Sequence, residues 1–341
     1  MKKTKIIALL ALSVLVAGAA HAKAKDKLFR LGASNGENAR FGGAIGVSIE
    51  TGILEEELKK VGYKAEYFGF SNGVATNEAI LSGDVDIVSI GDLPGLTGFS
   101  NGIGSIWLAD EDKLSDVGIL IRDDANINTI EDFYGKPIAV NFGTAPHFQF
   151  EQWVIDYGVD RSQLDIQNLT AVNGILALKT KDVVAVAAVW KRLLPVEEAG
   201  KYHEFWTTLE RPDLSGQTMI VGRKKFIDKN EKAVVAFFKA LYRAREEIIK
   251  DPIKWYDIIS SGYLNNQPEL GEKLYNRENN KFYNFDFKLS EDEITRAQKE
   301  YDFFLSIERF RTKKDVHNFV NNSYAQKAYK ELKNAGFAIT E

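Results

Sequence analysis

Residues able to do chemistry gather where a predicted strand gives way to a predicted helix. The clearest case follows the apolar strand 137–140, where Gly143 allows a tight turn and Thr144 is a good N-cap. Pro146 falls in the first helical turn, where its missing N–H costs nothing. Such a helix start favours anions, because its unpaired N–H groups and its dipole both attract negative charge. We therefore predict an anion site here with His147 as a hydrogen-bond donor, although a plain cap beside a surface histidine also explains the pattern.

Two more predicted strands end in polar or aromatic residues. Asp92 follows strand 86–90, and Trp190, Lys191 and Arg192 follow strand 183–189. In open α/β sheets ligands bind at the carboxyl ends of the strands, so these termini predict one shared cleft. Taken singly, each has a simpler explanation: an N-cap for Asp92, a core position for Trp190, and a solvated face for the two basic residues.

The pentapeptide Gly-Phe-Ser-Asn-Gly occurs twice, at 69–73 and 98–102. Each copy matches the G-x-S-x-G motif of serine hydrolases, and the first lies between a predicted strand and a predicted helix, as that motif requires. Against this interpretation, the chain lacks an HGGG-type oxyanion loop, and both copies cannot be the nucleophile. Gly, Ser and Asn are also common in turns and N-caps. A secreted serine hydrolase using residues 69–73 is retained as an alternative.

Composition excludes several classes of protein. The 341 residues contain no cysteine, which excludes disulfide frameworks, thiolate catalysis and cysteine metal sites. No two histidines have helical ligand spacing, so we expect no metal site. We also expect no cofactor and no catalytic residues. A net charge of −4 argues against nucleic acid as a partner.

Residues 1–22 have the three parts of a secretory signal peptide. Lysines at positions 2, 3 and 5 precede an apolar stretch, and Ala20-His21-Ala22 is a small-residue cleavage site. We predict cleavage after Ala22. Without a cysteine to carry a lipid anchor, the expected location is the periplasm.

Strands and helices alternate through most of the remaining chain, which predicts an α/β fold with largely parallel sheets. From residue 225 onward the pattern is almost entirely helical. Short apolar segments at 118–121 and 219–222 are interpreted as hinge strands, and the polar tract 110–116 as a turn-like break. The expected organisation is a discontinuous lobe 1 (23–118 and 223–341) with lobe 2 (119–222) inserted into it.

An ordered series of motifs resembles the periplasmic solute-binding proteins of ABC importers, specifically the nitrate, sulfonate, taurine and thiamine-precursor group. The resemblance covers roughly residues 28 to 225. The matching stretches are Gly52–Leu58, Phe70–Gly73, Glu78–Asp86, Gly91–Pro94, Ile130–Val140, Gly143–His147, Ala187–Trp190 and Gln217-Thr218.

The resemblance implies a type 2 periplasmic binding protein fold, with two crossing hinge strands and two lobes that close on a small ligand. It implies capture of an anionic solute (a sulfonate, taurine or a nitrate-like anion) and delivery to a permease and its ATPase at the inner membrane, with a monomeric receptor. A thiamine-precursor (pyrimidine) binding protein is the alternative within the group. The residues predicted to contact ligand, from the resemblance and the strand-end argument together, are Ser34, Asn35, Phe41, Ser71, Asp92, Gly143, Thr144, His147, Trp190, Lys191 and Gln217.

The chain departs from this group directly after Trp190. Many sulfonate and taurine binders resemble one another in having Asp-Pro there, with the acid facing an amine of the ligand. This chain has Lys191-Arg192 instead. The difference argues against taurine and favours an anion that has no amine or that has a second acidic group.

Overall fold

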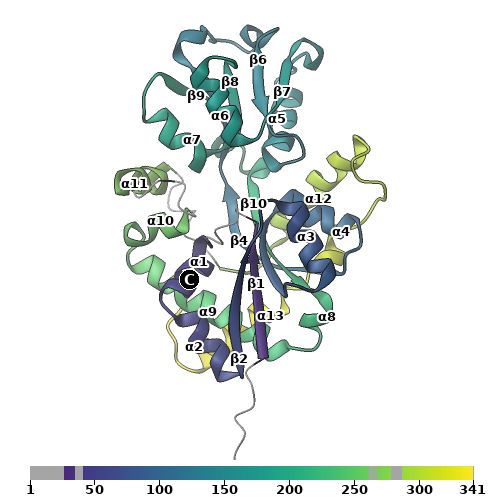
Figure 1. Cartoon of the computed structure of the whole chain (residues 1–341), viewed down its shortest axis with the longest axis vertical. Helices are drawn as coiled ribbons and strands as arrows, with labels where there is room; N and C mark the ends of the chain where they lie inside the picture. Colours follow the sequence, from purple (N-terminus) through teal and green to yellow (C-terminus); the bar gives the residue numbers. More distant parts are fainter. Residues whose placement is uncertain (1–26, 35–40, 261–263, 265–266, 278–285, 341) are drawn as a thin grey trace, which may run out of the picture.

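A computed structural model describes residues 27–34, 41–260, 264, 267–277 and 286–340. The predicted signal peptide and Asn35 lie outside these residues. The chain forms two lobes stacked along the long axis of the molecule, each built on one five-stranded sheet (Figure 1). This confirms the predicted two-lobed α/β fold.

Lobe 1 contains the sheet with strand order β2-β1-β3-β10-β4. β1, β2 and β3 are parallel, and β10 runs antiparallel to both of its neighbours. The strands are β1 (Lys27–Ala33), β2 (Tyr63–Gly69), β3 (Ile87–Gly91), β4 (Ser105–Ser115) and β10 (Gly216–Arg223). The helices of this lobe are α1 (Gly43–Glu50), α2 (Ile53–Lys60), α3 (Gly73–Ser82), α4 (Asp92–Ser100), α8 (Lys224–Ile227), α9 (Glu231–Lys250), α10 (Tyr256–Ile259), α12 (Glu291–Ser306) and α13 (Ser323–Asn334).

Lobe 2 contains the sheet with strand order β7-β6-β8-β5-β9, in which β6, β7 and β8 are parallel and β5 is antiparallel to its neighbours. Its strands are β5 (Val117–Arg122), β6 (Pro137–Val140), β7 (Asp165–Asn168), β8 (Ala185–Val189) and β9 (Tyr202–Thr207). Its helices are α5 (Ala145–Asp156), α6 (Ala171–Thr180) and α7 (Trp190–Glu197).

The chain crosses between the lobes at two short points. β4 ends at Ser115 and β5 begins at Val117, so Asp116 alone lies between the two sheets. The return crossing ends where β10 begins at Gly216. The predicted hinge strand 219–222 instead lies inside the sheet of lobe 1, because β10 pairs with both β3 and β4. The predicted boundary at residue 222 therefore falls a few residues too late.

The polar tract 110–116 is not a turn-like break. Its first six residues form the carboxyl half of β4, where Asp110, Glu111 and Asp112 are all buried. The strand continues through these acids because β10 pairs with it along this stretch.

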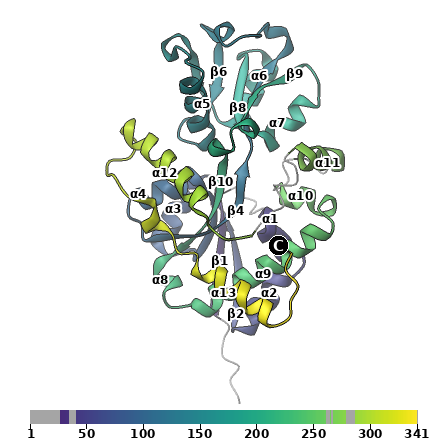
Figure 2. The same cartoon turned by 180° about the vertical axis from the view of Figure 1, so that it is seen from behind.

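The helical segment after residue 225 covers more than lobe 1. α9 and α13 pack on lobe 1, whereas α11 (Pro268–Arg277) packs on α7 of lobe 2, with Leu270 and Leu274 in the same apolar cluster as Trp190. α12 lies beside α4 and below α5 (Figure 2). Its Phe303 contacts Phe148 of α5, with ring centroids 5.4 Å apart. The C-terminal helices α11 and α12 therefore both contact lobe 2, and α12 also contacts lobe 1.

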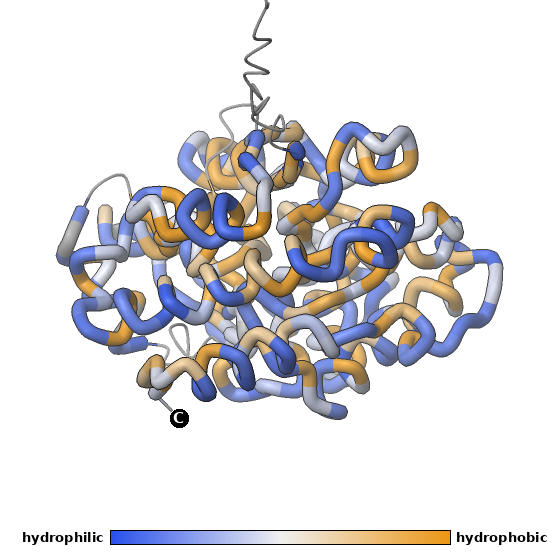
Figure 3. Tube along the Cα trace, turned by 90° about the horizontal axis from the view of Figure 1, so that it is seen from below, coloured by the Kyte–Doolittle hydropathy of each residue, from blue (hydrophilic) through white to orange (hydrophobic). Residues whose placement is uncertain are grey.

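Seen along the long axis, hydrophilic and hydrophobic segments alternate along the helices and turns (Figure 3). No helix within the described ranges is both long enough and apolar enough to span a bilayer.

Candidate functional site

A pocket of about 500 Å³ lies between the lobes, a size typical of small-molecule sites. The parallel strands of both sheets direct their carboxyl ends at it: Ser34 after β1, Gly91 at the end of β3, Asn141 after β6 and Val189 at the end of β8. The predicted meeting of strand ends in one cleft is therefore observed.

Among the described residues, the starts of six helices line this pocket. Lobe 1 contributes α1, α3 and α4, and lobe 2 contributes α5, α6 and α7. Asn72 caps α3 and Thr170 caps α6, each accepting a backbone N–H. The starts of α1, α4, α5 and α7 have no side-chain cap. The pocket therefore presents backbone N–H groups and positive helix ends from both lobes, the arrangement that stabilises an anion.

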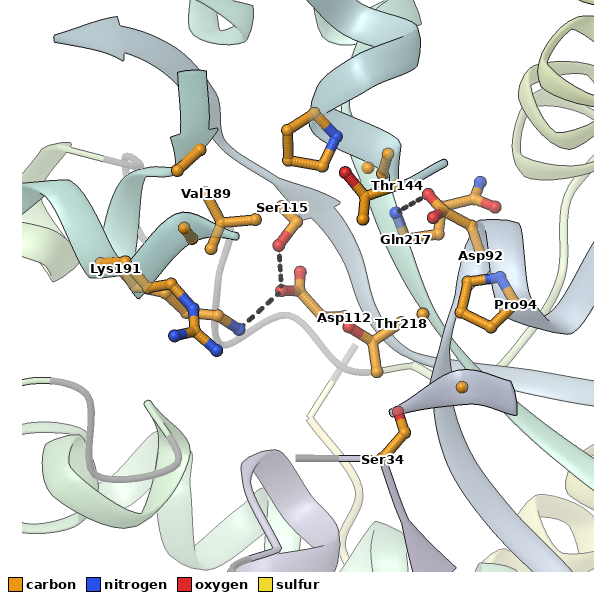
Figure 4. Close-up of a pocket in the computed structure, with 18 of the residues that line it drawn as sticks. Ser34, Asp92, Pro94, Asp112, Ser115, Thr144, Val189, Lys191, Gln217 and Thr218 are labelled. Carbon is orange, nitrogen blue, oxygen red and sulfur yellow. Dashed lines mark hydrogen bonds and ion pairs between the residues drawn. The ribbon is translucent and has the colours of Figure 1, made fainter. Parts of the chain in front are cut away.

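Six of the predicted ligand contacts line the pocket. They are Ser34, Ser71, Asp92, Thr144, Lys191 and Gln217. Figure 4 labels all of these except Ser71 around the cavity and shows Lys191 and Asp112 directed toward one another from opposite lobes. Lys191 Nζ lies 4.0 Å from Asp112 Oδ2, and Ser115 Oγ donates to the same carboxylate over 3.0 Å.

Asp92 and Gln217 also hold the site together. Asp92 Oδ2 accepts the Gln217 backbone N–H at 2.8 Å, and Oδ1 accepts that of Leu93 at 2.8 Å. Burial raises the pKa of Asp92 to about 6, and these hydrogen bonds oppose the rise. The Gln217 amide donates in turn to the Glu293 carbonyl of α12. The two residues join the start of α4 to β10 and to the helix behind the pocket.

Four predicted contacts are not part of the pocket lining, and each has another role. Phe41 is buried in lobe 1 with its ring edge-on to Tyr67. Trp190 is fully buried, and the Arg277 guanidinium lies 3.9 Å above its ring. The remaining two are His147 and Gly143.

His147 lies on α5 with its ring near Phe303 and Phe304 of α12, and it is not part of the described pocket lining. Its Nδ1 accepts the Gly143 backbone N–H at 3.3 Å, and its ring stacks on Phe142 at 4.8 Å. Gly143 has a φ of +74°, and a Cβ there would lie 2.5 Å from the Arg309 guanidinium. Gly143 and His147 therefore shape the helix start, while Thr144, Ala145 and Pro146 of the same motif line the pocket.

Glu111 and Asp112 line the pocket and were not predicted from the sequence. The available signal was the apolar run 106–109 shortly before them, which looks like the apolar strand before Asp92, but β4 continues past these acids to Ser115. Burial raises the pKa of Glu111 to about 7, while the Ser89 hydroxyl and the Lys191 charge oppose that rise.

A metal centre and an activated serine are two other kinds of site that pocket residues can form. The described residues contain no group of three or more carboxylate or histidine side chains able to hold a metal. Ser71 Oγ accepts a hydrogen bond from Asn72, and none of the described histidines lines the pocket. The serine hydrolase alternative therefore lacks a general base at Ser71 within the described part of the chain.

Comparison with known proteins identifies the relatives of this chain. Residues 113–254 match the family model described as NMT1/THI5 like. A Bacillus subtilis (strain 168) protein whose name assigns it to aliphatic sulfonate binding is 24% identical over 298 residues, 85% of this chain and 86% of that protein. The taurine-binding periplasmic protein of Escherichia coli (strain K12) is 28% identical over 201 residues, 58% of this chain and 61% of that protein.

The chain is similar in sequence to an aliphatic sulfonate-binding protein and to a taurine-binding periplasmic protein. This confirms the resemblance found in its motifs. The sulfonate-binding protein SsuA from Methylobacillus flagellatus KT has the same fold, with a TM-score of 0.77 and 20% identity over 93% of this chain and 98% of that one. The desulfurization enzyme DSZB also shares the fold, with a TM-score of 0.70 and 11% identity over 89% of this chain and 99% of that one.

Proposed function

We propose that the chain is the periplasmic substrate-binding component of an ABC importer and that the pocket captures a small organic sulfonate. One observation carries this proposal: six helix starts from two lobes surround one pocket, and four of them lack a side-chain cap. The names of the relatives support sulfonate as the anion. In this proposal a monomeric receptor delivers its ligand to an inner-membrane permease and its ATPase.

The same comparison and the N-terminal residues support a periplasmic location. The names of the homologues support the periplasm, and the pattern of residues 1–22 supports export with cleavage after Ala22.

Turnover of the ligand is the competing function, because the desulfurization enzyme DSZB has this fold. The chain contains no cysteine, and no histidine lies in the described pocket lining. A binding protein would return its ligand unchanged, so analysis of the ligand by mass spectrometry after incubation separates the two functions.

A thermal-shift screen tests the proposed ligand class. The panel contains taurine, isethionate, ethanesulfonate, nitrate and a thiamine-precursor pyrimidine. A ligand at 100 times its Kd adds about 2.7 kcal/mol, which raises the Tm of a chain of this size by about 4 °C. Stabilisation by sulfonates supports the proposal. Stabilisation by the pyrimidine alone, or conversion of a sulfonate, contradicts it.

Lys191→Met provides the matched variant for this screen. Lys191 lines the pocket from α7, whereas Lys179 lies exposed on α6 of the same lobe. Loss of one charge-assisted contact weakens sulfonate binding by roughly tenfold or more, measured by calorimetry. Lys179→Met removes the same charge from the lobe and leaves the Kd unchanged. Equal effects of the two variants would mean that Lys191 does not hold the ligand.

A further inference from the structure

An irregularity in β4 places two consecutive carboxylates at the pocket. Opposite β10, Asp110 pairs with Met219 and Asp112 pairs with Thr218, so Glu111 lies between them with no residue across from it. An extra residue of this kind is a β-bulge, and bulges beside functional sites redirect side chains. In a regular strand, neighbouring side chains point to opposite faces. Here both Glu111 and Asp112 line the pocket.

The hydrogen bonding of Glu111 is incomplete. The side chain is buried, with 5% of the residue exposed. Its Oε2 accepts a hydrogen bond from the Ser89 hydroxyl of β3. Its Oε1 accepts none from any described residue and faces the start of α1, where a Cβ on Gly43 would lie 2.8 Å away. A buried carboxylate oxygen without a donor destabilises the protein, so a donor supplied by a ligand would be favourable.

The charges of the pocket lie in two groups. Lobe 1 contributes the carboxylates of Asp92, Glu111 and Asp112, and lobe 2 contributes Lys191 and Arg192. The described lining therefore carries a formal charge of −1. A purely anionic ligand adds another negative charge to it, whereas a ligand with both an anionic and a cationic group adds none. The second kind fits the pocket better.

On the basis of the proposed function, we infer that Glu111 determines specificity by accepting a hydrogen bond from the ammonium group of an aminoalkanesulfonate. The sulfonate then lies toward α7 and its two basic residues. The acid that faces the amine comes from β4, and not from the position after Trp190. This reverses the expectation drawn from Lys191-Arg192, because sequence alone did not reveal a carboxylate elsewhere in the pocket.

Three ligands of similar size test this inference: taurine, isethionate and ethanesulfonate, which end in ammonium, hydroxyl and methyl groups. Calorimetry on the unmodified protein should show taurine binding roughly 10 to 100 times more tightly than ethanesulfonate, the range expected for a hydrogen bond between charged groups. In Glu111→Gln the preference should fall to about threefold or less, with ethanesulfonate affinity unchanged.

Glu57→Gln is the control, since Glu57 is an equally buried carboxylate on α2 outside the described pocket lining. This variant should keep the full preference for taurine. Equal affinities in the unmodified protein, isethionate binding as tightly as taurine, or a uniform loss for all three ligands in Glu111→Gln would overturn the inference. If the unmodified protein binds none of the three, the proposed function fails as well, so the two failures are distinguishable.

A pH series keeps the inference testable even if Glu111→Gln does not fold. The charged or titratable groups facing Glu111 are Asp112 beside it on β4 and Lys191 from α7, with the Ser89 hydroxyl on β3. With a pKa of about 7, Glu111 is mostly protonated at pH 6 and mostly ionised at pH 8. An ammonium group binds the ionised form, so taurine affinity should rise about tenfold over this range. Ethanesulfonate affinity should not rise. A flat taurine profile would overturn the inference.

Discussion

Arg277 joins the C-terminal helix α11 to the crossing point between the lobes. Its substitution should lower the free energy of unfolding. Arg277 Nε lies 3.0 Å from the carboxylate of Asp116, the residue between β4 and β5 whose side chain is fully buried. The same guanidinium contacts Glu204 and lies over the Trp190 ring. Arg277→Met removes these interactions and leaves the buried Asp116 carboxylate without a cationic partner.

The size of the expected loss in unfolding free energy depends on how deeply the ion pair between Arg277 and Asp116 is buried. Removing one partner of a buried ion pair costs about 3–5 kcal/mol. The lower end applies, because the Arg277 side chain is 20% exposed and Asp116 keeps the hydroxyls of Thr207 and Thr208. We expect a loss of about 3 kcal/mol, or a decrease in Tm of about 4–5 °C for a chain of this size.

Urea unfolding measures this loss, with an unchanged slope as evidence that the variant unfolds in the same way. Arg211→Met is the control, since Arg211 forms more exposed pairs with Asp156 and Asp213 and should cost about 1 kcal/mol or less. In the double variant with Asp116→Asn, part of the stability should return, because the unpaired charge is gone. Equal losses for Arg277→Met and Arg211→Met would refute the reasoning.

The pH dependence gives a second readout of the same pair. Burial raises the pKa of Asp116, and Arg277 opposes that rise. Without Arg277 the pKa rises further, so the folded variant takes up a proton as the pH falls and loses the penalty of the buried charge. The stability deficit relative to the unmodified protein should therefore be largest near pH 8 and smaller near pH 5. A deficit that grows toward low pH would contradict this explanation.

Two other substitutions probe the pocket wall. Ser89→Ala removes the hydroxyl that favours the ionised form of Glu111, so the pKa of Glu111 should rise. Taurine affinity, measured by calorimetry, should then fall at pH 7 and recover near pH 8.5. A loss of affinity at both pH values would contradict this prediction. Gly73→Ala places a Cβ 2.3 Å from Pro94 Cβ, which should separate the starts of α3 and α4. The free energy of unfolding in urea should fall by about 1–3 kcal/mol, and sulfonate binding should weaken. Unchanged sulfonate affinity would mean that binding does not require these helix starts to lie together.

The sequence predicted the parallel strands and their following helices well, because regular alternation and Gly-rich turns mark them. The cleft between the lobes, with Thr144 in its lining, followed from the same rule about strand ends. The position of His147 did not follow, because helical periodicity alone does not show which face packs on Phe303 and Phe304 of the distant helix α12.

The acidic half of β4 was the main feature that sequence could not assign. A run of acids is typical of an exposed turn, and only pairing with β10 and burial beneath α1 make it a strand. The position of α11 was equally hidden, since its contact with α7 joins segments about 80 residues apart. Both features depend on tertiary contacts that local patterns do not encode.

A crystal structure of the protein with taurine tests the central claim most directly. We expect the ligand in the interlobe pocket, with its sulfonate against the uncapped starts of α5 and α7 and its ammonium nitrogen within hydrogen-bond distance of Glu111. A sulfonate bound outside the pocket, or an amine directed away from both Glu111 and Asp112, would contradict the account.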